Sequence, residues 1–450
     1  MEKFFKLEER GTNKKREMVA GITTFLSMAY ILAVNPQILS GAGMDSGAVF
    51  TATCISAGIG TLIMAFLANY PVALASGMGL NAYFAYTVCP MVGTEHPWEV
   101  ALAAILVEGI IFVLLSFTNF REKLVNEIPS NLKYGITVGI GLFVAIIGLK
   151  NSGAVTVTTE GGIALGDLAS AGVTLSLVGV LIIAFMESKK IKGAILWGIL
   201  ITWVLGMLAE LVGWYVPDPE AGVFSVMLNL DFSNVIPTAP YLFDFDFAWI
   251  GEHILEFAVI VFSFLYVDIF DTVGTLIGVA QRGNLLDEEG NLPRAKQALL
   301  SDAIGTIAGA CLGTSTVTSY VESTAGVGAG GRTGLASVWT GGLFIVALFL
   351  SPIFLSIPSF ATTPALIYVG FLMMKSVSNI HWSKHEADLG EVISAFLAII
   401  MMPFTSSIAN GIMFGIISYV VLKVAIGKIK EVPVVMWISA ALFVLYMVVS

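Results

Sequence analysis

The sequence has few charged residues and few cysteines. Only 12% of its 450 residues are charged, whereas 57% are hydrophobic. A soluble domain carries about 25% charged residues, so the composition excludes a soluble globular protein and indicates a polytopic membrane protein. The three cysteines, Cys54, Cys89 and Cys311, lie in or at the ends of apolar segments. Their spacing fits neither a disulfide framework nor a metal site, and we expect no metal and no other cofactor.

Apolar runs of about 20 residues recur along the whole chain, and each can cross a bilayer as a helix. They leave no room for a separate soluble domain. The tail at 432–450 is long enough to cross the membrane or to lie on it, and its sequence leaves both open. The other segments are expected at 18–40, 48–69, 72–90, 99–118, 131–150, 171–187, 191–213, 250–281, 296–312, 314–332, 335–352, 361–378, 390–404 and 408–426.

Basic residues lie on one side of the membrane if the chain crosses at each of these segments. Residues 1–17 hold six of them and are expected to be cytoplasmic, because cytoplasmic ends carry an excess of Lys and Arg. Only Lys150 falls outside, and the expected extracellular loop 214–249 has no Lys or Arg. We therefore expect a multi-pass protein of the cell membrane. The later cytoplasmic residues are Arg121, Lys123, Lys133, Lys189, Lys190, Lys192, Arg282, Arg294, Lys296, Arg332, Lys375, Lys384, Lys423, Lys428 and Lys430.

The segments form two sets of seven, 18–213 and 250–430, followed by the apolar segment 431–450. Because seven is odd, the second set starts from the opposite side of the membrane, and the two halves have inverted topology. This arrangement is typical of secondary transporters, in which the substrate lies near the midplane between interrupted helices. The sequence therefore predicts an all-α polytopic membrane protein with 14 transmembrane segments as a 7+7 inverted repeat.

The third segment of each set is interrupted by glycine and polar residues. Tyr70–Val88 contains Pro71, two glycines and the amide Asn81, and Leu312–Leu335 is rich in Gly, Ser and Thr and contains Glu322. Interrupted segments at matched positions are the best sequence pointer to a transport site. Glycines that merely allow close helix packing are the alternative, but they do not account for a carboxylate and a run of hydroxyls.

Three acidic residues are expected at membrane depth near these interruptions. Asp268 and Asp271 lie three residues apart, hence on one helical face, and Glu322 lies in the interrupted segment. Placing a carboxylate in the bilayer centre is costly in free energy, so such a residue indicates a functional site. The alternative is a structural role, in which the carboxylate hydrogen-bonds a neighbouring helix. For Glu108 and Asp302 we expect only such a structural role.

The expected site offers acceptors and lacks a positive charge. No Lys or Arg is expected at the midplane, so three carboxylates would repel an anion and favour a ligand with N–H donors. A neutral planar heterocycle or a cation fits this requirement, and Asn81 can both donate and accept. Aromatic ring faces could come from Phe25, Tyr30, Tyr83, Phe84 and Tyr266.

Two further patterns carry no chemistry in our interpretation. Gly326–Thr333, GVGAGGRT, resembles a phosphate-binding loop, but that motif requires a strand before it and a helix after it in a soluble nucleotide-binding fold. We therefore expect no ATP site. The histidines, His96, His253, His381 and His385, show no metal-ligand spacing.

With these residues in view, the chain resembles a nucleobase–cation symporter of the azaguanine-type purine permease subfamily. The resemblance spans both halves, and LLDEEGNLPRAKQALLSD (285–302) also fits. The four stretches that carry it are GITTFLSMAYILAVNPQIL (21–39), SGMGLNAYFAYTV (76–88), FLYVDIFDTVGTLIGVA (264–280) and GTSTVTSYVESTAGVGAGGRTG (313–334).

The resemblance implies a core domain, 18–118 with 250–352, and a gate domain, 131–213 with 361–426. Segments three and ten would be part strand and part helix. Asp268 and Glu322 would hydrogen-bond the ring nitrogens of a purine, and Asp271 would support the site or, with them, the proton path. The remaining substrate-binding residues would be Asn81, Thr24, Phe25, Gly79, Tyr320, Val321 and Ser323.

The resemblance thus predicts a transporter, not an enzyme, that imports adenine, guanine or hypoxanthine by proton symport with alternating access. The expected partners are a purine nucleobase, protons and the lipid bilayer, with a possible homodimer and no nucleic acid. A uracil or xanthine permease and an anion exchanger of the same fold are the alternatives. The missing basic residue argues against the anion exchanger.

Overall fold

The computed structural model describes residues 2–116, 128–158, 162–217, 223–228, 238–287, 292–382 and 389–449, without the side chains of Val157, Phe270 and Val449. Several residues considered above lie outside these ranges. They are Arg121, Lys123, Lys384, His385, part of the loop 214–249, part of the stretch 285–302, and the ends of the expected segments 99–118 and 432–450.

The described half before the long loop is mostly helical, with three short strands. Its elements are α1 (Glu2–Phe5), α2 (Lys14–Met28), α3 (Ile31–Ser40), α4 (Ser46–Ile63), η1 (Met64–Ala68), β1 (Leu74–Ser76), α5 (Met78–Tyr83), η2 (Phe84–Val88), α6 (Cys89–Val92), α7 (Pro97–Ser116), α9 (Ser130–Asn151), β2 (Val155–Val157), β3 (Ile163–Leu165), α10 (Ala171–Ser188) and α11 (Ala194–Leu211).

The second half also consists mainly of long helices, and its described residues contain one short strand. Its elements are α12 (Ala248–Glu252), α13 (Ile254–Gly283), α14 (Ala295–Leu312), β4 (Val317–Ser319), α15 (Ser323–Gly328), α16 (Gly334–Ala347), η5 (Leu348–Leu350), α17 (Ser351–Leu355), α18 (Ser359–Met374), η6 (Lys375–Asn379), α19 (Leu389–Phe404), α20 (Ile408–Ala425), η7 (Ile429–Glu431) and α21 (Val434–Val449).

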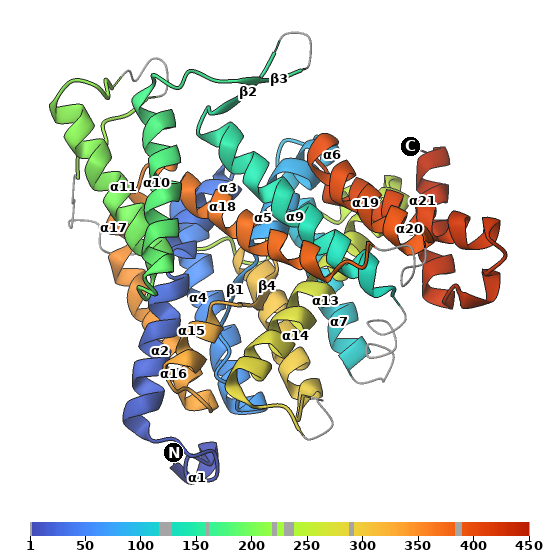
Figure 1. Ribbon diagram of the computed structural model, residues 1–450, viewed down its shortest axis with the longest axis horizontal. Coiled ribbons are helices and arrows are strands. Elements are labelled where there is room, and N and C mark those ends of the chain that lie inside the picture. Colours follow the sequence, from blue (N-terminus) through green and yellow to red (C-terminus); the bar gives the residue numbers. More distant parts are fainter. Residues whose placement is uncertain are drawn as a thin grey trace.

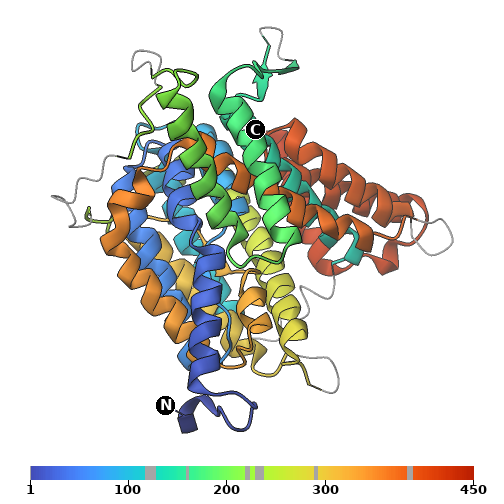
Figure 2. The ribbon, with the colours of Figure 1, turned by 60° about the vertical axis from the view of Figure 1, so that its left-hand side comes forward.

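Within the described residues, nine helical stretches are long and apolar enough to cross a membrane. Two shorter apolar helices, Leu389–Phe404 and Val434–Val448, accompany them. The chain is therefore a multi-pass membrane protein of mostly helical fold, as the sequence indicated. The hairpin of β2 and β3, between α9 and α10, was not expected; it protrudes at the end of the molecule opposite α1 (Figures 1 and 2).

The strands β1 and β4 cross in the middle of the molecule as an antiparallel pair (Figure 1). Their register pairs Leu74 with Ser319 and Ser76 with Val317. Two more backbone bonds extend the pairing, from the Gly77 N–H to the Thr316 oxygen at 3.0 Å and from the Tyr320 N–H to the Ala73 oxygen at 2.9 Å. Both strands are fully buried, so each N–H or C=O left without a partner would cost several kcal/mol.

Two threonines from neighbouring helices bind the first residue of each strand. The Thr61 hydroxyl on α4 lies 2.9 Å from the Leu74 nitrogen and 3.1 Å from its oxygen. The Thr306 hydroxyl on α14 donates to the Val317 oxygen at 3.0 Å. Between them, Gly60 and Gly305 face each other so closely that a Cβ on Gly60 would lie 3.5 Å from the Gly305 Cα. The two halves therefore support their strands with the same residue types at the same positions.

Short helices follow both strands. Gly77, with extended backbone, precedes α5, and Gly313, at φ +83°, ends α14 before β4. A side chain at Gly313 would meet Tyr241 at 2.5 Å in addition to the strain of its positive φ. The sequence signals of interruption thus coincide with real changes of direction.

The helices form two packed groups. In one, α18 and α19 pack on α9, α20 packs on α19, and α10 and α11 pack on α18. In the other, α16 packs on α2 and α4, α14 packs on α4 and α7, and α13 packs on α7. In Figure 1, α19 and α20 lie on the right-hand side, and α9 and α18 run across the middle toward them.

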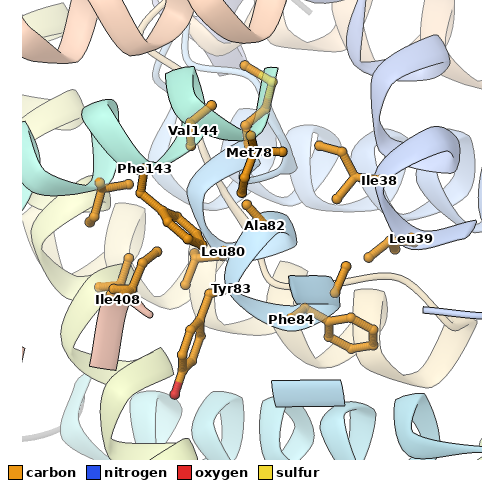
Figure 3. Packing of buried hydrophobic residues seen from close by; sticks show 14 of the residues in the cluster. Ile38, Leu39, Met78, Leu80, Ala82, Tyr83, Phe84, Phe143, Val144 and Ile408 are labelled. Atoms are coloured by element: carbon orange, nitrogen blue, oxygen red, sulfur yellow. The ribbon is translucent and has the colours of Figure 1, made fainter. Parts of the chain in front are cut away.

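Helix α5 joins the two groups through buried apolar side chains (Figure 3). Leu80 of α5 lies beside Phe143 of α9, and Phe84, the first residue of η2, lies near Leu39 of α3. The packing fixes the start of α5 between the groups, at one wall of the cavity described below.

Candidate functional site

A cavity of about 90 Å³ lies where the two interrupted segments meet the other helix group. One water needs roughly 10–15 Å³ by the same measure, so the space holds several waters or a small ring. Most of its lining comes from the strand ends, α13, α9 and α18. The lining residues are Tyr30, Gly77, Met78, Gly79, Leu80, Ile136, Thr137, Ile140, Val267, Asp271, Thr275, Ser319, Tyr320, Val321, Glu322, Val369 and Met373.

Two carboxylates face this cavity from different elements. Glu322 is the residue that precedes α15, and its Oε1 accepts a hydrogen bond from the Tyr30 hydroxyl at 2.6 Å. Asp271 lies on α13, with Val267 and Thr275 one turn away on either side. The structure thus brings together an acid of each sequence motif, and both are only partly buried.

Asp268 occupies a different place from the one expected for a substrate ligand. It is fully buried, and among the described residues the cavity lining includes Asp271 but not Asp268. The Thr272 hydroxyl lies 3.4 Å from its Oδ1. The spacing of three residues put both acids on one helical face, but their neighbours differ, so Asp271 takes the position at the cavity.

Behind the cavity wall, Asp302 of α14 organises a buried hydrogen-bond network. The Thr272 hydroxyl donates to its Oδ2 at 2.7 Å, and the Ser319 hydroxyl donates to its Oδ1 at 2.9 Å. The hydroxyls of Thr272 and Thr318 lie 2.8 Å apart. Asp302 thereby ties α13 to β4, which is the structural role that the sequence suggested for it.

Three of the other expected site residues line the cavity. Gly79 leaves it open, because a Cβ there would lie 2.6 Å from the Ile140 side chain. The Tyr320 hydroxyl donates to the Ser76 carbonyl and so braces β1 against β4. Val321 is 48% exposed, which makes it an accessible apolar surface of the lining.

The remaining expected residues are not part of the cavity lining as far as the described residues show. Ser323 accepts the Ala73 N–H at 3.0 Å, and Thr24 packs against Gly326. Phe25 packs edge-on against Phe344, with ring centroids 5.2 Å apart. Asn81 is fully buried on α5, and its side-chain amide has no hydrogen-bond partner within the described part of the chain.

Sequence reasoning missed the wall contributed by α9 and α18. Ile136, Thr137 and Ile140 come from α9, and Val369 and Met373 come from α18. These helices read as ordinary apolar segments, and no signal in them identified the residues. Thr275 is different, since it follows Asp271 by four residues and helical spacing alone could have found it.

The glycine-rich stretch Gly326–Thr333 is the end of α15 and the turn into α16. Arg332 donates from its guanidinium to the carbonyls of Val327 and Gly331, at 2.8 and 2.6 Å. The stretch thus consists of a helix end and the turn into the next helix. Among the described residues, no group of three or more His, Cys, Asp and Glu side chains could hold a metal ion.

A cavity with partly buried carboxylates, between two helix groups of a multi-pass membrane fold, is typical of a membrane transporter. The chain belongs to the permease family, whose sequence model matches residues 15–414. This match confirms the resemblance to nucleobase–cation symporters that the motifs indicated.

Known proteins resemble the chain over almost its full length. It is 42% identical to the adenine permease AdeP of Escherichia coli, over 100% of this chain and 96% of that protein. It is also 42% identical to the guanine/hypoxanthine permease PbuO of Bacillus subtilis, over 98% of each chain. Among solved structures, the transmembrane domain of the cyanobacterial bicarbonate transporter BicA matches with a TM-score of 0.64 and 14% identity, covering 89% of this chain and 97% of that chain. This last likeness concerns the fold alone.

The network around Asp302 predicts a loss of stability in the variant Asp302→Ala. The Ser319 hydroxyl would lose its acceptor in a fully buried place, which costs about 1–3 kcal/mol. The Thr272 hydroxyl would also lose this acceptor but keeps the Thr318 hydroxyl 2.8 Å away. We expect a lower thermal unfolding midpoint of the purified protein in detergent. The control is Glu95→Ala, at an exposed side chain, and equal midpoints for the two variants would contradict the assignment.

Proposed function

We propose that the protein imports purine nucleobases, namely adenine, guanine or hypoxanthine. The observation that carries the proposal is the cavity itself, which Asp271 and Glu322 line and which no Lys or Arg enters among the described lining residues. Two relatives that are 42% identical over nearly the whole chain are named adenine and guanine/hypoxanthine permeases, and this supports the same substrate class here.

The chemistry of the lining suits a flat ring with N–H groups. Carboxylates accept hydrogen bonds only, and each can take two donors from a heterocycle. The surfaces of Ile136, Ile140 and Met373 offer apolar contact to the ring faces. An anionic substrate would meet two carboxylates without a compensating cation, which disfavours an anion exchanger even though BicA has a similar fold.

In the proposal, Glu322 and Asp271 bind the ring nitrogens directly. Asp268 lies farther inside, where it supports α13 and belongs to the proton path rather than to the substrate contact. Asn81 lies on the other interrupted segment, and its side-chain amide has no hydrogen-bond partner in the part of the chain that the structure describes. A movement of α5 would allow this amide to hydrogen-bond the substrate or a water molecule.

The architecture in this proposal is a 7+7 inverted repeat of fourteen segments. β1 with α5 forms the third segment, and β4 with α15 forms the tenth. The matched pairs Thr61 with Thr306 and Gly60 with Gly305 support this assignment, because an inverted repeat places equivalent residues face to face across its axis. The helix α21 follows the fourteenth segment.

The two helix groups correspond to a core domain, 18–118 with 250–352, and a gate domain, 131–213 with 361–426. The carboxylates and interrupted segments belong to the core, whereas α9 and α18 supply the gate's part of the cavity lining. A displacement of the core along the gate would expose the cavity to each side in turn. The protein would act in the cell membrane with its N-terminus in the cytoplasm.

Proton symport follows from the same carboxylates. Moving two ionised acids past the apolar surface of α9 and α18 would be costly in free energy. Protonation of Glu322, Asp271 or Asp268 removes one charge, so it would favour the movement of the loaded core. A proton would then enter the cell with each purine.

Competition for uptake tests the substrate class. Cells that express the protein should accumulate labelled hypoxanthine with saturable kinetics, and excess adenine or guanine should reduce this uptake strongly. Uracil and xanthine should compete weakly, because the proposal assigns the site to the other purines. Strong competition by uracil or xanthine alone would point to the alternative permease class.

The variant Glu322→Gln should lower uptake at low substrate concentration by about 10–100-fold. The amide replaces one of the two acceptor oxygens with a donor, and loss of a charged acceptor costs about 1.5–3 kcal/mol, or roughly 10–100-fold in affinity. The control is Glu95→Gln, at an exposed position, and the amount of each variant in the membrane should equal that of the unmodified protein. Uptake at the normal rate by Glu322→Gln would refute the assignment.

Coupling to protons predicts that accumulation collapses when a protonophore dissipates the pH gradient. Replacing sodium with potassium outside the cell should leave accumulation unchanged, since the proposed coupling groups are carboxylic acids that bind protons. Accumulation that requires sodium and survives the protonophore would show that a different ion drives transport.

A further inference from the structure

The loop that resembles a phosphate-binding motif does hold an anion, but the anion belongs to the chain itself. The Glu17 carboxylate on α2 is fully buried against the turn between α15 and α16. Its Oε1 accepts the Arg332 N–H at 2.9 Å, and its Oε2 accepts the N–H groups of Thr333 and Ala336 at 3.3 and 3.2 Å. The Thr12 hydroxyl donates a fourth bond to Oε1 at 2.8 Å.

The Glu17 carboxylate caps the N-terminus of α16 with a negative charge. The helix spans Gly334–Ala347, and its first N–H groups have no partner inside the helix. A carboxylate at a helix start satisfies such groups and interacts favourably with the helix dipole. Glu17 therefore fixes the turn after α15 from a residue more than 300 positions earlier in the chain.

Close backbone contacts prevent α2 from sliding along the tenth segment. A Cβ on Gly326 would lie 2.0 Å from the Thr24 hydroxyl and 2.6 Å from the Ala20 oxygen. A Cβ on Gly21 would lie 2.4 Å from the Ala336 oxygen. Helices this close have one register only, because side chains and backbone leave no free space between them.

The other end of this contact is at the cavity. Tyr30 lies just beyond α2 and donates to the Glu322 carboxylate at 2.6 Å. It follows Glu17 by thirteen residues, which is about 20 Å along a helix. The stretch from Glu17 to Tyr30 is therefore attached to the tenth segment at both ends, at the turn after α15 and at the residue before it.

We propose that Glu17 is a positioning residue for transport, which sets the height and rotation of α15 and so presents the Glu322 carboxylate to the substrate. The inference rests on the proposed function of Glu322 in the cavity. Glu17 itself touches no substrate. It acts through α2, α15 and the hydrogen bond from Tyr30.

The variant Glu17→Gln tests this role, because its amide replaces an acceptor oxygen with a donor that faces backbone N–H groups. We expect faster amide hydrogen exchange across 323–336 in the purified protein without substrate. The control Glu8→Gln makes the same change at an exposed side chain of the turn between α1 and α2 and should leave the exchange unchanged. Unchanged exchange in Glu17→Gln would overturn the proposal.

Uptake kinetics provide the second measurement. Glu17→Gln should raise the KM for the purine by about tenfold, with a smaller effect on the maximal rate per transporter, since a displaced Glu322 weakens binding. Combined with Tyr30→Phe, the two effects on KM should be clearly less than additive, because both changes act on Glu322. Additive effects, or a normal KM despite faster exchange, would reduce Glu17 to a stabilising contact and overturn the positioning role.

A second variant and the substrate-free exchange measurement allow the proposal to be tested even if Glu17→Gln or the uptake assay fails. If Glu17→Gln does not fold, Thr12→Val removes only one of the four hydrogen bonds and should shift exchange and KM in the same direction by less. No shift in either quantity would contradict the inference. The exchange measurement needs no substrate. If the unmodified protein takes up no nucleobase, the proposed function is wrong, but the effect of Glu17 on the turn after α15 can still be measured.

Discussion

The structure depends on the pairing of two short strands at membrane depth. Neither β1 nor β4 can satisfy its own backbone, and a backbone group left unpaired at membrane depth is costly. Each strand supplies the partners that the other needs, and Thr61 and Thr306 bind the remaining groups at the strand starts. This pairing sets where α5 and α15 begin, and those helix starts form part of the cavity wall. An irregular backbone can thus line a cavity because it is paired.

The cavity acquires its chemistry from acids held at different depths. Glu322 and Asp271 reach the open space, whereas Asp302 and Asp268 lie behind them among threonine and serine hydroxyls. Asp302 holds α13 and β4 together, and this supports the positions of the outer acids. On the far side, α9 and α18 present mainly apolar side chains to the cavity.

The two interrupted segments and the acidic residues near them could be predicted from the sequence. Pro71, Gly77 and Gly313 marked the interruptions, and the carboxylates stood out against apolar neighbours. The relative placement of Asp268 and Asp271 could not be predicted, because residues three apart share a helical face and only the surrounding elements distinguish them. Asn81 was expected in the pocket and is instead enclosed within α5 and its neighbours.

The sequence by itself determined the membrane class, the positions of the apolar segments, the two interruptions and the family. These properties are local, since they depend on hydropathy and on the backbone preferences of a few residues. Only the tertiary structure decided that α9 and α18 close the cavity and that Glu17 holds the turn after α15. Both depend on contacts between segments far apart in the chain. The sequence of an apolar helix does not show which of its faces lines a cavity. In the same way, the sequence around a glutamate near a basic terminus does not show whether its carboxylate is solvated or binds the start of a distant helix.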